Sequence, residues 1–415
     1  MEKSKVYFCD MHATPEEPLP NKLHRLIKTA GFEQIDFKDK FVAVKIHFGE
    51  MGNLAFLRPN YAKVVCDYIK TLGGKPFVTD CNTLYVGSRK NALDHLDCAY
   101  ENGYNPFSTG VHTIIADGIK GLNEVLVPVE GGEYVKEAKI GEAIMEADIV
   151  ISLNHFKGHE MTGFGGAIKN LGMGCGSRAG KMEMHNAGKP YIYSDACIGC
   201  GKCLKICAHN APVITNKIAK IDHNKCVGCG RCIAICPKDA ASVNWDESAD
   251  ILNCKIAEYA KAVVQNRSSF HINMLIDVSP CCDCHAENDM PIIPDVGMFA
   301  SFDPIAIDMA CGEMANRQPA LPGSVAFIKP PHHKHGECGE HGHHGHGECD
   351  GHGHGDGCGC DHPHPHHPHH PHHPHHHDPN HDHFKHIAPG TNWISAMNHG
   401  EKLGLGTKEY EVVKI

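Results

Sequence analysis

The hydrophobic pattern of the first part of the chain alternates between two periods. Short apolar runs predict strands at 5–8, 41–48, 76–79, 112–115, 125–129 and 148–153. Between these runs, apolar residues recur at helical spacing, as at Leu23, Leu26 and Ile27 before Gly31. Further helices are expected to begin at Pro59 and to cover about 137–147.

The same alternation returns towards the end of the chain, with a helix predicted at 250–265 and a strand at 270–278. Another helix is expected after Asp303, which can cap it, with Pro304 at the first helical position. Near-continuous apolar strands that alternate with helices are typical of sheets buried on both faces. The sequence therefore predicts an α/β fold with a mostly parallel sheet and helices on both faces.

Residues 188–246 interrupt this pattern with two cysteine phrases, CIGCGKCLKIC at 197–207 and CVGCGRCIAIC at 226–236. Both have the spacing C-x2-C-x2-C-x3-C, and Pro237 follows the second, which is the bacterial-type pattern for [4Fe-4S] clusters. A zinc site is the alternative, but zinc takes four ligands that usually come as separated C-x2-C pairs. Because the fourth cysteine of each phrase reaches the other cluster, the expected ligand sets are Cys197, Cys200, Cys203 and Cys236 for one cluster, and Cys226, Cys229, Cys232 and Cys207 for the other.

This segment resembles the two-cluster ferredoxin family, although Ala208 stands where that family usually has Pro. The resemblance implies a compact α+β module that passes electrons one at a time. Both flanks of the segment are incomplete α/β patterns, so the module is predicted to be inserted into one domain. The expected division is 188–246 for the module and 1–187, 247–331 and 387–415 for the α/β domain.

Residues 332–386 have a different composition, with 23 of the 36 histidines of the chain and no apolar period. Such a tract cannot bury enough surface to fold, so a disordered insertion is predicted. Dense imidazoles bind Ni, Cu, Zn or Co weakly, which leaves two alternatives, a metal-binding tract and a low-complexity insertion without a ligand. The candidate nickel or zinc ligands include His343, His344, His366, His367, His369, His370, His372, His373, His375, His376 and His377.

Charge and composition limit the partners of the protein. A formal net charge of -10 argues against nucleic acid or an anionic membrane as the main partner. The sequence has no apolar run long enough for a membrane span and no signal-peptide pattern, so a cytoplasmic protein is expected. In that compartment, 22 cysteines indicate metal ligation rather than disulfides. Iron–sulfur clusters would make the protein sensitive to oxygen, so an anaerobic host is the natural expectation.

Polar residues interrupt segments that are predicted to be buried, and most of them follow strands directly. The carboxyl ends of strands are where open α/β sheets bind ligands. Lys45 and His47 alternate with apolar residues and share one face of their strand, where they either face solvent or point into a cleft. The candidate catalytic residues are Lys45, His47, His155, Lys157, His159 and Lys169.

At these positions the chain resembles the DUF362 family of proteins of unknown function, which often carry ferredoxin modules. The resemblance rests on the phrases KIHFGE, NHFKGH, GAIKNLGMGCGSR, KMEMH and SFDPIAID. It implies a fold and cluster binding, but no reaction.

The remaining cysteines fall into two groups. Vicinal cysteines in a loop after a strand are hard to explain as core packing. They are candidates for a further metal site or a redox-active thiol site, formed by Cys175, Cys281, Cys282 and Cys284 together with Asp283 and His285. The alternative is that one or two of them are buried as small hydrophobes. Cys9, Cys66, Cys98, Cys254 and Cys311 lie in apolar contexts and are expected to fill the core.

Three functions fit these features. The first is a ferredoxin-type oxidoreductase in which electrons pass through two [4Fe-4S] clusters to a substrate or additional metal site in the α/β domain. The second is a metal-handling or storage protein that uses the His-rich tract with redox-active clusters. The third is a plain electron carrier. The expected partner is a redox protein or a small-molecule substrate.

Overall fold

The computed structural model describes residues 3–85, 87–185, 189–243, 247–327 and 381–415. Its central element is an eight-stranded sheet of order β16-β1-β15-β14-β7-β2-β3-β4. Five of its seven strand pairs are parallel, and β15 is antiparallel to both neighbours. A mostly parallel sheet is therefore confirmed. Its strands are β1 (Ser4–Asp10), β2 (Phe41–Lys45), β3 (Lys75–Asp80), β4 (Thr113–Ile115), β7 (Ile149–His155), β14 (Ser268–Leu275), β15 (Gly297–Ser301) and β16 (Tyr410–Lys414).

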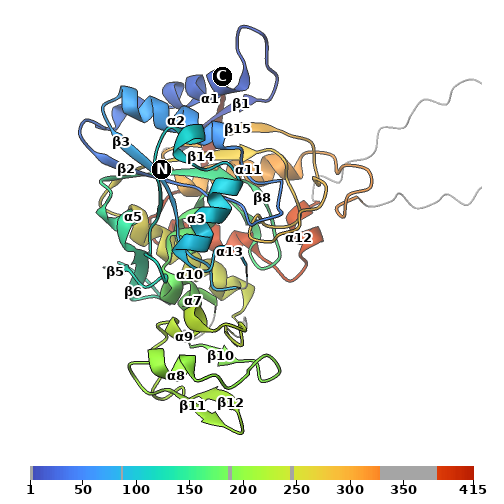
Figure 1. Ribbon diagram of the computed structural model, residues 1–415. Helices are drawn as coiled ribbons and strands as arrows, with labels where there is room; N and C mark the ends of the chain where they lie inside the picture. Colours follow the sequence, from blue (N-terminus) through green and yellow to red (C-terminus); the bar gives the residue numbers. More distant parts are fainter. Residues whose placement is uncertain (1–2, 86, 186–188, 244–246, 328–380) are drawn as a thin grey trace, which may run out of the picture. The chain divides into compact units, whose positions relative to one another are not determined.

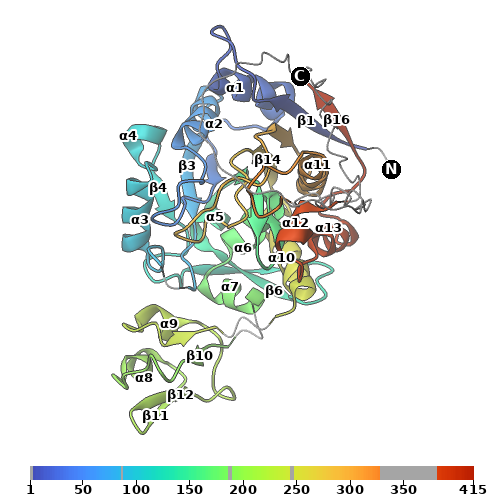
Figure 2. The same ribbon diagram turned by 90° about the vertical axis from the view of Figure 1, so that its right-hand side faces the viewer.

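Helices cover both faces of this sheet, as predicted (Figures 1 and 2). Along β2, Val42 and Val44 pack into one core and Ala43 into the other, which is the two-residue period of a strand buried on both faces. The core with Val42 and Val44 contains α1 (Leu19–Thr29) and α2 (Pro59–Thr71). The opposite core contains α6 (Ala167–Cys175), α10 (Ala249–Val264) and α11 (Pro304–Asn316). Asp303 caps α11 through the amides of Ile305 and Ala306, as its sequence predicts.

Strands from both sides of the cysteine-rich segment meet in this sheet. β7 precedes the segment and β14 follows it, and the two pair in parallel from Ile149–Ser268 to His155–Met274. The predicted limits at 188 and 246 both fall outside the described residues, so the domain boundaries stay a prediction. Within 189–243, the segment forms the antiparallel pairs β10 (Tyr191–Ile192) with β13 (Ala241–Ser242) and β11 (Pro212–Thr215) with β12 (Ile218–Ile221), together with α8 (Lys202–Ile206) and α9 (Arg231–Ile235).

The helix predicted at 137–147 is wrong in its first half. Residues Glu137–Gly141 form β6, which pairs with β5 (Glu124–Pro128), and only Glu142–Glu146 form a helix, α5. Ala138 and Ile140 are buried at alternate positions, which is the period of a strand. The helical prediction failed because this short segment has too few apolar residues to separate the two periods.

The smaller elements lie around the sheet and complete the fold. They are the 3-10 helix η1 (Phe32–Gln34), α3 (Ala92–Glu101), α4 (Pro106–Thr109), α7 (Arg178–His185), α13 (Trp393–Lys402) and the hairpin of β8 (Lys157–His159) with β9 (Gly163–Gly165). Among the helices in the described parts of the chain, none combines the length and hydropathy needed to cross a membrane.

The His-rich tract predicted at 332–386 lies outside the described residues up to position 380, and this includes all the histidines from His343 to His377 proposed as ligands. The predicted limit at 386 is too late, because a helix, α12 (His383–Ile387), begins before it. Asp382 caps this helix through the amides of Phe384 and Lys385, and Phe384 is fully buried. The limit was set too late because the histidines around Phe384 made this helix look like part of the His-rich tract.

Candidate functional site

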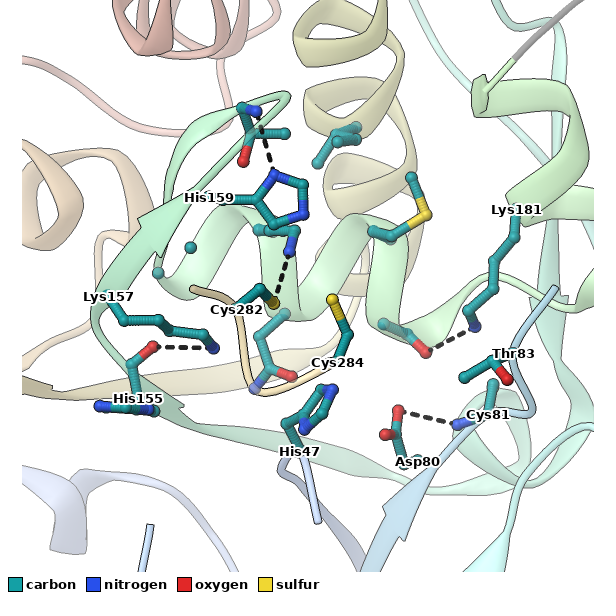
Figure 3. Close-up of a pocket in the computed structure, with 18 of the residues that line it drawn as sticks. His47, Asp80, Cys81, Thr83, His155, Lys157, His159, Lys181, Cys282 and Cys284 are labelled. Atoms are coloured by element: carbon teal, nitrogen blue, oxygen red, sulfur yellow. Dashed lines mark hydrogen bonds between the residues drawn. The ribbon is translucent and has the colours of Figure 1, made fainter. Parts of the chain in front are cut away.

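A pocket with about 850 Å³ of empty space lies where β2, β3 and β7 end (Figure 3). This is the edge at which parallel sheets place ligands. Five of the six predicted catalytic residues line the pocket, namely His47, His155, Lys157, His159 and Lys169. The sequence prediction that these polar residues point into one cleft agrees with this geometry. Their roles remain predictions.

Lys45 lies beneath the pocket rather than in its lining. Its ammonium lies 2.9 Å from Asp80 and donates to the side-chain oxygen of Asn170 at 2.6 Å. Both charged side chains are buried, with 0% and 3% of their surface exposed. Burial opposes ionisation of Asp80, but Lys45 and then His47 hold the pKa of this carboxyl below its ordinary value. The pair therefore fixes the floor of the pocket.

Arg89, from the loop after β3, was missed by sequence reasoning. Its guanidinium is 1% exposed and lies 3.0 Å from Glu50, and it also contacts the phenol oxygen of Tyr85. One of its nitrogens lies 3.0 Å from Nε2 of His47. Burial, and then the positive charge of Arg89, lower the pKa of His47 well below its ordinary value, so this imidazole is neutral near pH 7. The only sequence signal for Arg89 was its position in the loop that follows β3, since ligands bind beyond the carboxyl ends of strands.

Lys181 and His185 also line the pocket without having been predicted. Both come from α7 and belong to the phrase KMEMH, which carried the family resemblance but suggested no role. Lys181 donates to the carbonyl oxygens of Gly174 and Gly176 at 3.3 and 2.6 Å.

Asp283 anchors the opposite wall of the pocket. Its carboxylate oxygens lie 2.9 and 3.0 Å from Nδ1 of His155, and Lys157 lies 3.1 Å away. Burial opposes the charge on each partner, but the mutual attraction raises the pKa of Lys157 and lowers that of Asp283 well below its ordinary value. Lys157 is therefore a permanently charged cation in the pocket wall at neutral pH.

Of the four cysteines predicted as an extra site, Cys282 and Cys284 line the pocket. Their sulfurs and one ring nitrogen of His159 all lie within 4.8 Å of one another. Cys175 is fully buried and faces the carbonyl oxygen of Asn170, at 3.8 Å. Cys281 donates its amide to Ser279, and its side chain is not part of the pocket lining. The structure thus brings together two of the four cysteines and adds His159. The predicted His285 lies with Cys284 and Glu160 in a second group of ligand atoms within 4.8 Å.

The eight cysteines of residues 189–243 line two separate hollows. One contains Cys197, Cys200, Cys203 and Cys236 within about 370 Å³ of empty space. The other contains Cys207, Cys226, Cys229 and Cys232 within about 340 Å³. The two hollows separate the same two sets of four cysteines that the spacing predicts, and the role of these cysteines as cluster ligands stays a prediction. Gly199, Gly201, Gly228 and Gly230 all have positive φ values of 63–73°, which suits glycine in these tight turns.

A small hydrophobic core joins the cysteine-rich segment to the α/β part. Leu84 and Met182 pack in this core with Ile192, Ile233 and Val243, and four of the cysteines pack against it. Leu84 also lines the large pocket. One side chain therefore contacts both the core beside the cysteine hollows and the candidate site.

The family model described as "Domain of unknown function (DUF362)" matches residues 42–313. The chain belongs to the DUF362 family. The residues matched to the family include every pocket residue named above. No curated protein matches the chain.

Two solved structures show a weak likeness to this DUF362 protein. The lactate racemase apoprotein from Thermoanaerobacterium thermosaccharolyticum is 13% identical with a TM-score of 0.34, over 61% of this chain and 49% of that one. A protein from Thermotoga maritima is 14% identical with a TM-score of 0.33, over 70% of this chain and 56% of that one. The DUF362 chain thus spans about half the length of the structures it matches.

Proposed function

We propose that this DUF362 protein is an iron–sulfur oxidoreductase that transfers electrons through two [4Fe-4S] clusters to a substrate or additional metal site in the pocket. The observation that carries this proposal is the sorting of eight cysteines into two crossed quartets, each around its own hollow. When bound, the clusters would supply one-electron transfers at potentials that their surroundings set.

The spacing of the sulfurs favours clusters over zinc. A tetrahedral zinc ion with Zn–S bonds of about 2.3 Å brings its sulfurs to within about 3.8 Å of one another. In residues 189–243, no three of the cysteine sulfurs lie within 4.8 Å of one another. Sulfurs that lie further apart than this fit a [4Fe-4S] core, which is larger than a single zinc ion.

Contacts between the cysteine-rich segment and the α/β part support transfer towards the pocket. Lys90 forms an ion pair with Asp239. The side chain of Arg178 lies against Gly230, where a Cβ would be 2.9 Å from its Cδ. The Arg178 guanidinium donates to the carbonyl oxygen of Thr83, which lines the pocket, at 2.9 Å. Together with Leu84, these contacts link residues of the segment to residues that line the pocket.

The pocket residues suit an anionic substrate. The ammonium groups of Lys169 and Lys181 line the pocket, whereas the charge of Lys157, whose pKa Asp283 raises, is balanced by that carboxylate. Anions bind most strongly to cations in partly buried sites, where water screens little. We therefore include a carboxylate or phosphate group in the proposed substrate.

Oxygen-free purification tests the proposal. We expect about eight irons and eight acid-labile sulfides per chain, with a paramagnetic signal after reduction by dithionite. Cys229→Ser should lower the iron content by about half or more. Cys254→Ser is the matched control, because Cys254 is a half-buried cysteine of α10 outside both quartets, and it should leave the iron content unchanged. Zinc in place of iron, or no signal after reduction, would contradict the proposal.

A further inference from the structure

The loop that carries Cys282 and Cys284 is fixed from three sides. Gly158 donates its amide to the carbonyl oxygen of Ser279 at 2.9 Å, and Glu50 donates to that of Asp283 at 2.8 Å. Asn53 donates its side-chain amide to the carbonyl oxygen of His285 at 3.1 Å. Preorganised groups of this kind are typical of functional sites rather than of free surface loops.

Side-chain direction alternates within this loop. Asp283 contacts His155 and Lys157 in the protein interior. The cysteines on either side of it point into the pocket (Figure 3). The two sulfurs lie within 4.8 Å of one another and share a hydrogen bond. A C-x-C pair therefore presents two adjacent sulfurs to the same cavity.

His159 faces this pair with a ring N–H group rather than as a metal ligand. Its Nδ1 accepts hydrogen bonds from the amides of Met161 at 3.0 Å and Thr162 at 3.1 Å. A neutral imidazole that accepts at Nδ1 carries its proton on Nε2. Ligating histidines instead donate their second ring nitrogen to an acceptor. The backbone of β8–β9 thus holds the tautomer that aims N–H at the sulfurs.

Lys169 brings a positive charge to the pair of sulfurs. Its ammonium donates to Sγ of Cys282 at 3.2 Å. The hydrogen bond from Cys282 lowers the pKa of Cys284, whereas the same bond, and then burial, raise the pKa of Cys282 to about 12. Cys282 is buried whereas Cys284 is half-buried, so Cys284 is the sulfur that a substrate in the pocket reaches first and Cys282 is its partner.

We propose that Cys282 and Cys284 form a redox-active pair that cycles between a dithiol and an intramolecular disulfide. The Cys284 thiolate attacks an anionic small-molecule disulfide; the S–S bond of that substrate breaks, a mixed disulfide forms, and one thiol leaves. Cys282 then gives up its proton and attacks the Cys284 sulfur, which forms the Cys282–Cys284 bond and releases the second thiol. Two electrons and two protons restore the dithiol; the two clusters, each reduced by one electron from a redox partner protein, would supply these electrons, a step that rests on the proposed function.

Glutathione disulfide is the probe, because it is an anionic disulfide that oxidises the pair without the clusters. The anaerobic full-length protein is equilibrated in glutathione buffers of increasing oxidation, alkylated in acid, digested and analysed by mass spectrometry. We expect a peptide that links Cys282 to Cys284 and has lost two hydrogens, in the wild type and equally in Cys281→Ser. The Cys281 variant is the matched control, since Cys281 is adjacent but does not line the pocket.

The pH dependence of cysteine alkylation tests whether Lys169 acts on the thiols through its charge. Lys169→Met removes the cation beside Cys282, so the pH at which Cys284 reaches half its maximal alkylation rate should rise by about one unit or more. His159→Gln should keep the disulfide, because His159 takes no part in the S–S bond. Unchanged pH profiles in Lys169→Met would overturn the assigned charge effect.

The alternative results are distinct. A disulfide that needs Cys281 overturns the pairing, and a stoichiometric metal ion that is lost in both Cys282→Ser and Cys284→Ser overturns the dithiol in favour of a metal site. A pair that cycles in a protein without iron sustains this inference and contradicts the proposed function. Full iron content with no disulfide in any buffer would sustain the proposed function and overturn the redox-active pair.

Discussion

The buried ion pair between Lys45 and Asp80 gives the sharpest test of how the pocket floor is built. Its nitrogen–oxygen distance is 2.9 Å and its side chains are 0% and 3% exposed. Lys45→Met keeps the volume of the side chain but leaves the Asp80 carboxylate buried without its nearest cation. Breaking a buried pair in this way costs about 3–5 kcal/mol.

The lower end of that range applies here, because Arg89 stays 3.7 Å from the same carboxylate. We therefore expect Lys45→Met to lower the free energy of unfolding by about 3 kcal/mol, which is about a 150-fold change in the folding equilibrium. If Asp80 takes up a proton in the variant, the loss should be smaller at pH 5 than at pH 7. The assay is urea unfolding of the anaerobic protein, followed by circular dichroism.

Lys63→Met is the matched control for this variant. Lys63 pairs with Asp67 at 2.7 Å, but both side chains are nearly half exposed, at 48% and 46%. An exposed pair of this kind contributes about 0.5 kcal/mol or less. The double variant Lys45→Met/Asp80→Asn should recover part of the loss, since it removes the unpaired charge. Equal destabilisation by Lys45→Met and Lys63→Met would refute the reasoning.

Two further predictions concern the cysteine-rich segment and the loop that carries Cys282 and Cys284. Gly230→Ala should destabilise the protein by about 1 kcal/mol more than Gly201→Ala in urea, because both glycines have positive φ values, 67° and 71°, but only a Cβ at position 230 would meet Arg178, at 2.9 Å. Equal urea midpoints would contradict the contact with Arg178. The hydrogen bond to Glu160 raises the pKa of His285 from 6.5 to about 9, so the stability it contributes is complete below pH 6.5 and is lost as the pH rises through 9. The pair is half exposed, so this contribution is about 0.5 kcal/mol, and His285→Gln should abolish that part of the pH dependence of the urea midpoint.

The sheet was predictable from sequence because its strands are apolar on both faces. Val42, Val44 and Ala43 are all buried, so this run of apolar residues has no solvent face and reads as a central strand. The strand order was not predictable. β7 and β14 become neighbours although the whole cysteine-rich segment separates them in sequence, and local periodicity contains no information about which distant strands pair.

The candidate site was predictable only where a polar residue directly follows a strand. His47 and His155 were found in this way, since the carboxyl ends of parallel strands meet at one edge. Arg89 was missed because a buried guanidinium depends on Glu50 and Tyr85, which only tertiary folding brings to it. The same limit explains why Cys175 was grouped with the pocket cysteines, although its side chain faces the interior.

The lysines around the pocket fall into two groups according to their interaction partners. Lys45 and Lys157 each face a buried carboxylate, at 2.9 and 3.1 Å, so these pairs are locally neutral and hold the walls in place. Lys181 is held by backbone carbonyl oxygens, and Lys169 donates to the Cys282 sulfur. Carbonyl dipoles and a protonated thiol do not cancel a full positive charge, so the excess charge of the pocket lies on these two lysines. One of them is next to the C-x-C pair, which is where a thiolate needs stabilisation and where an anionic substrate would have to approach.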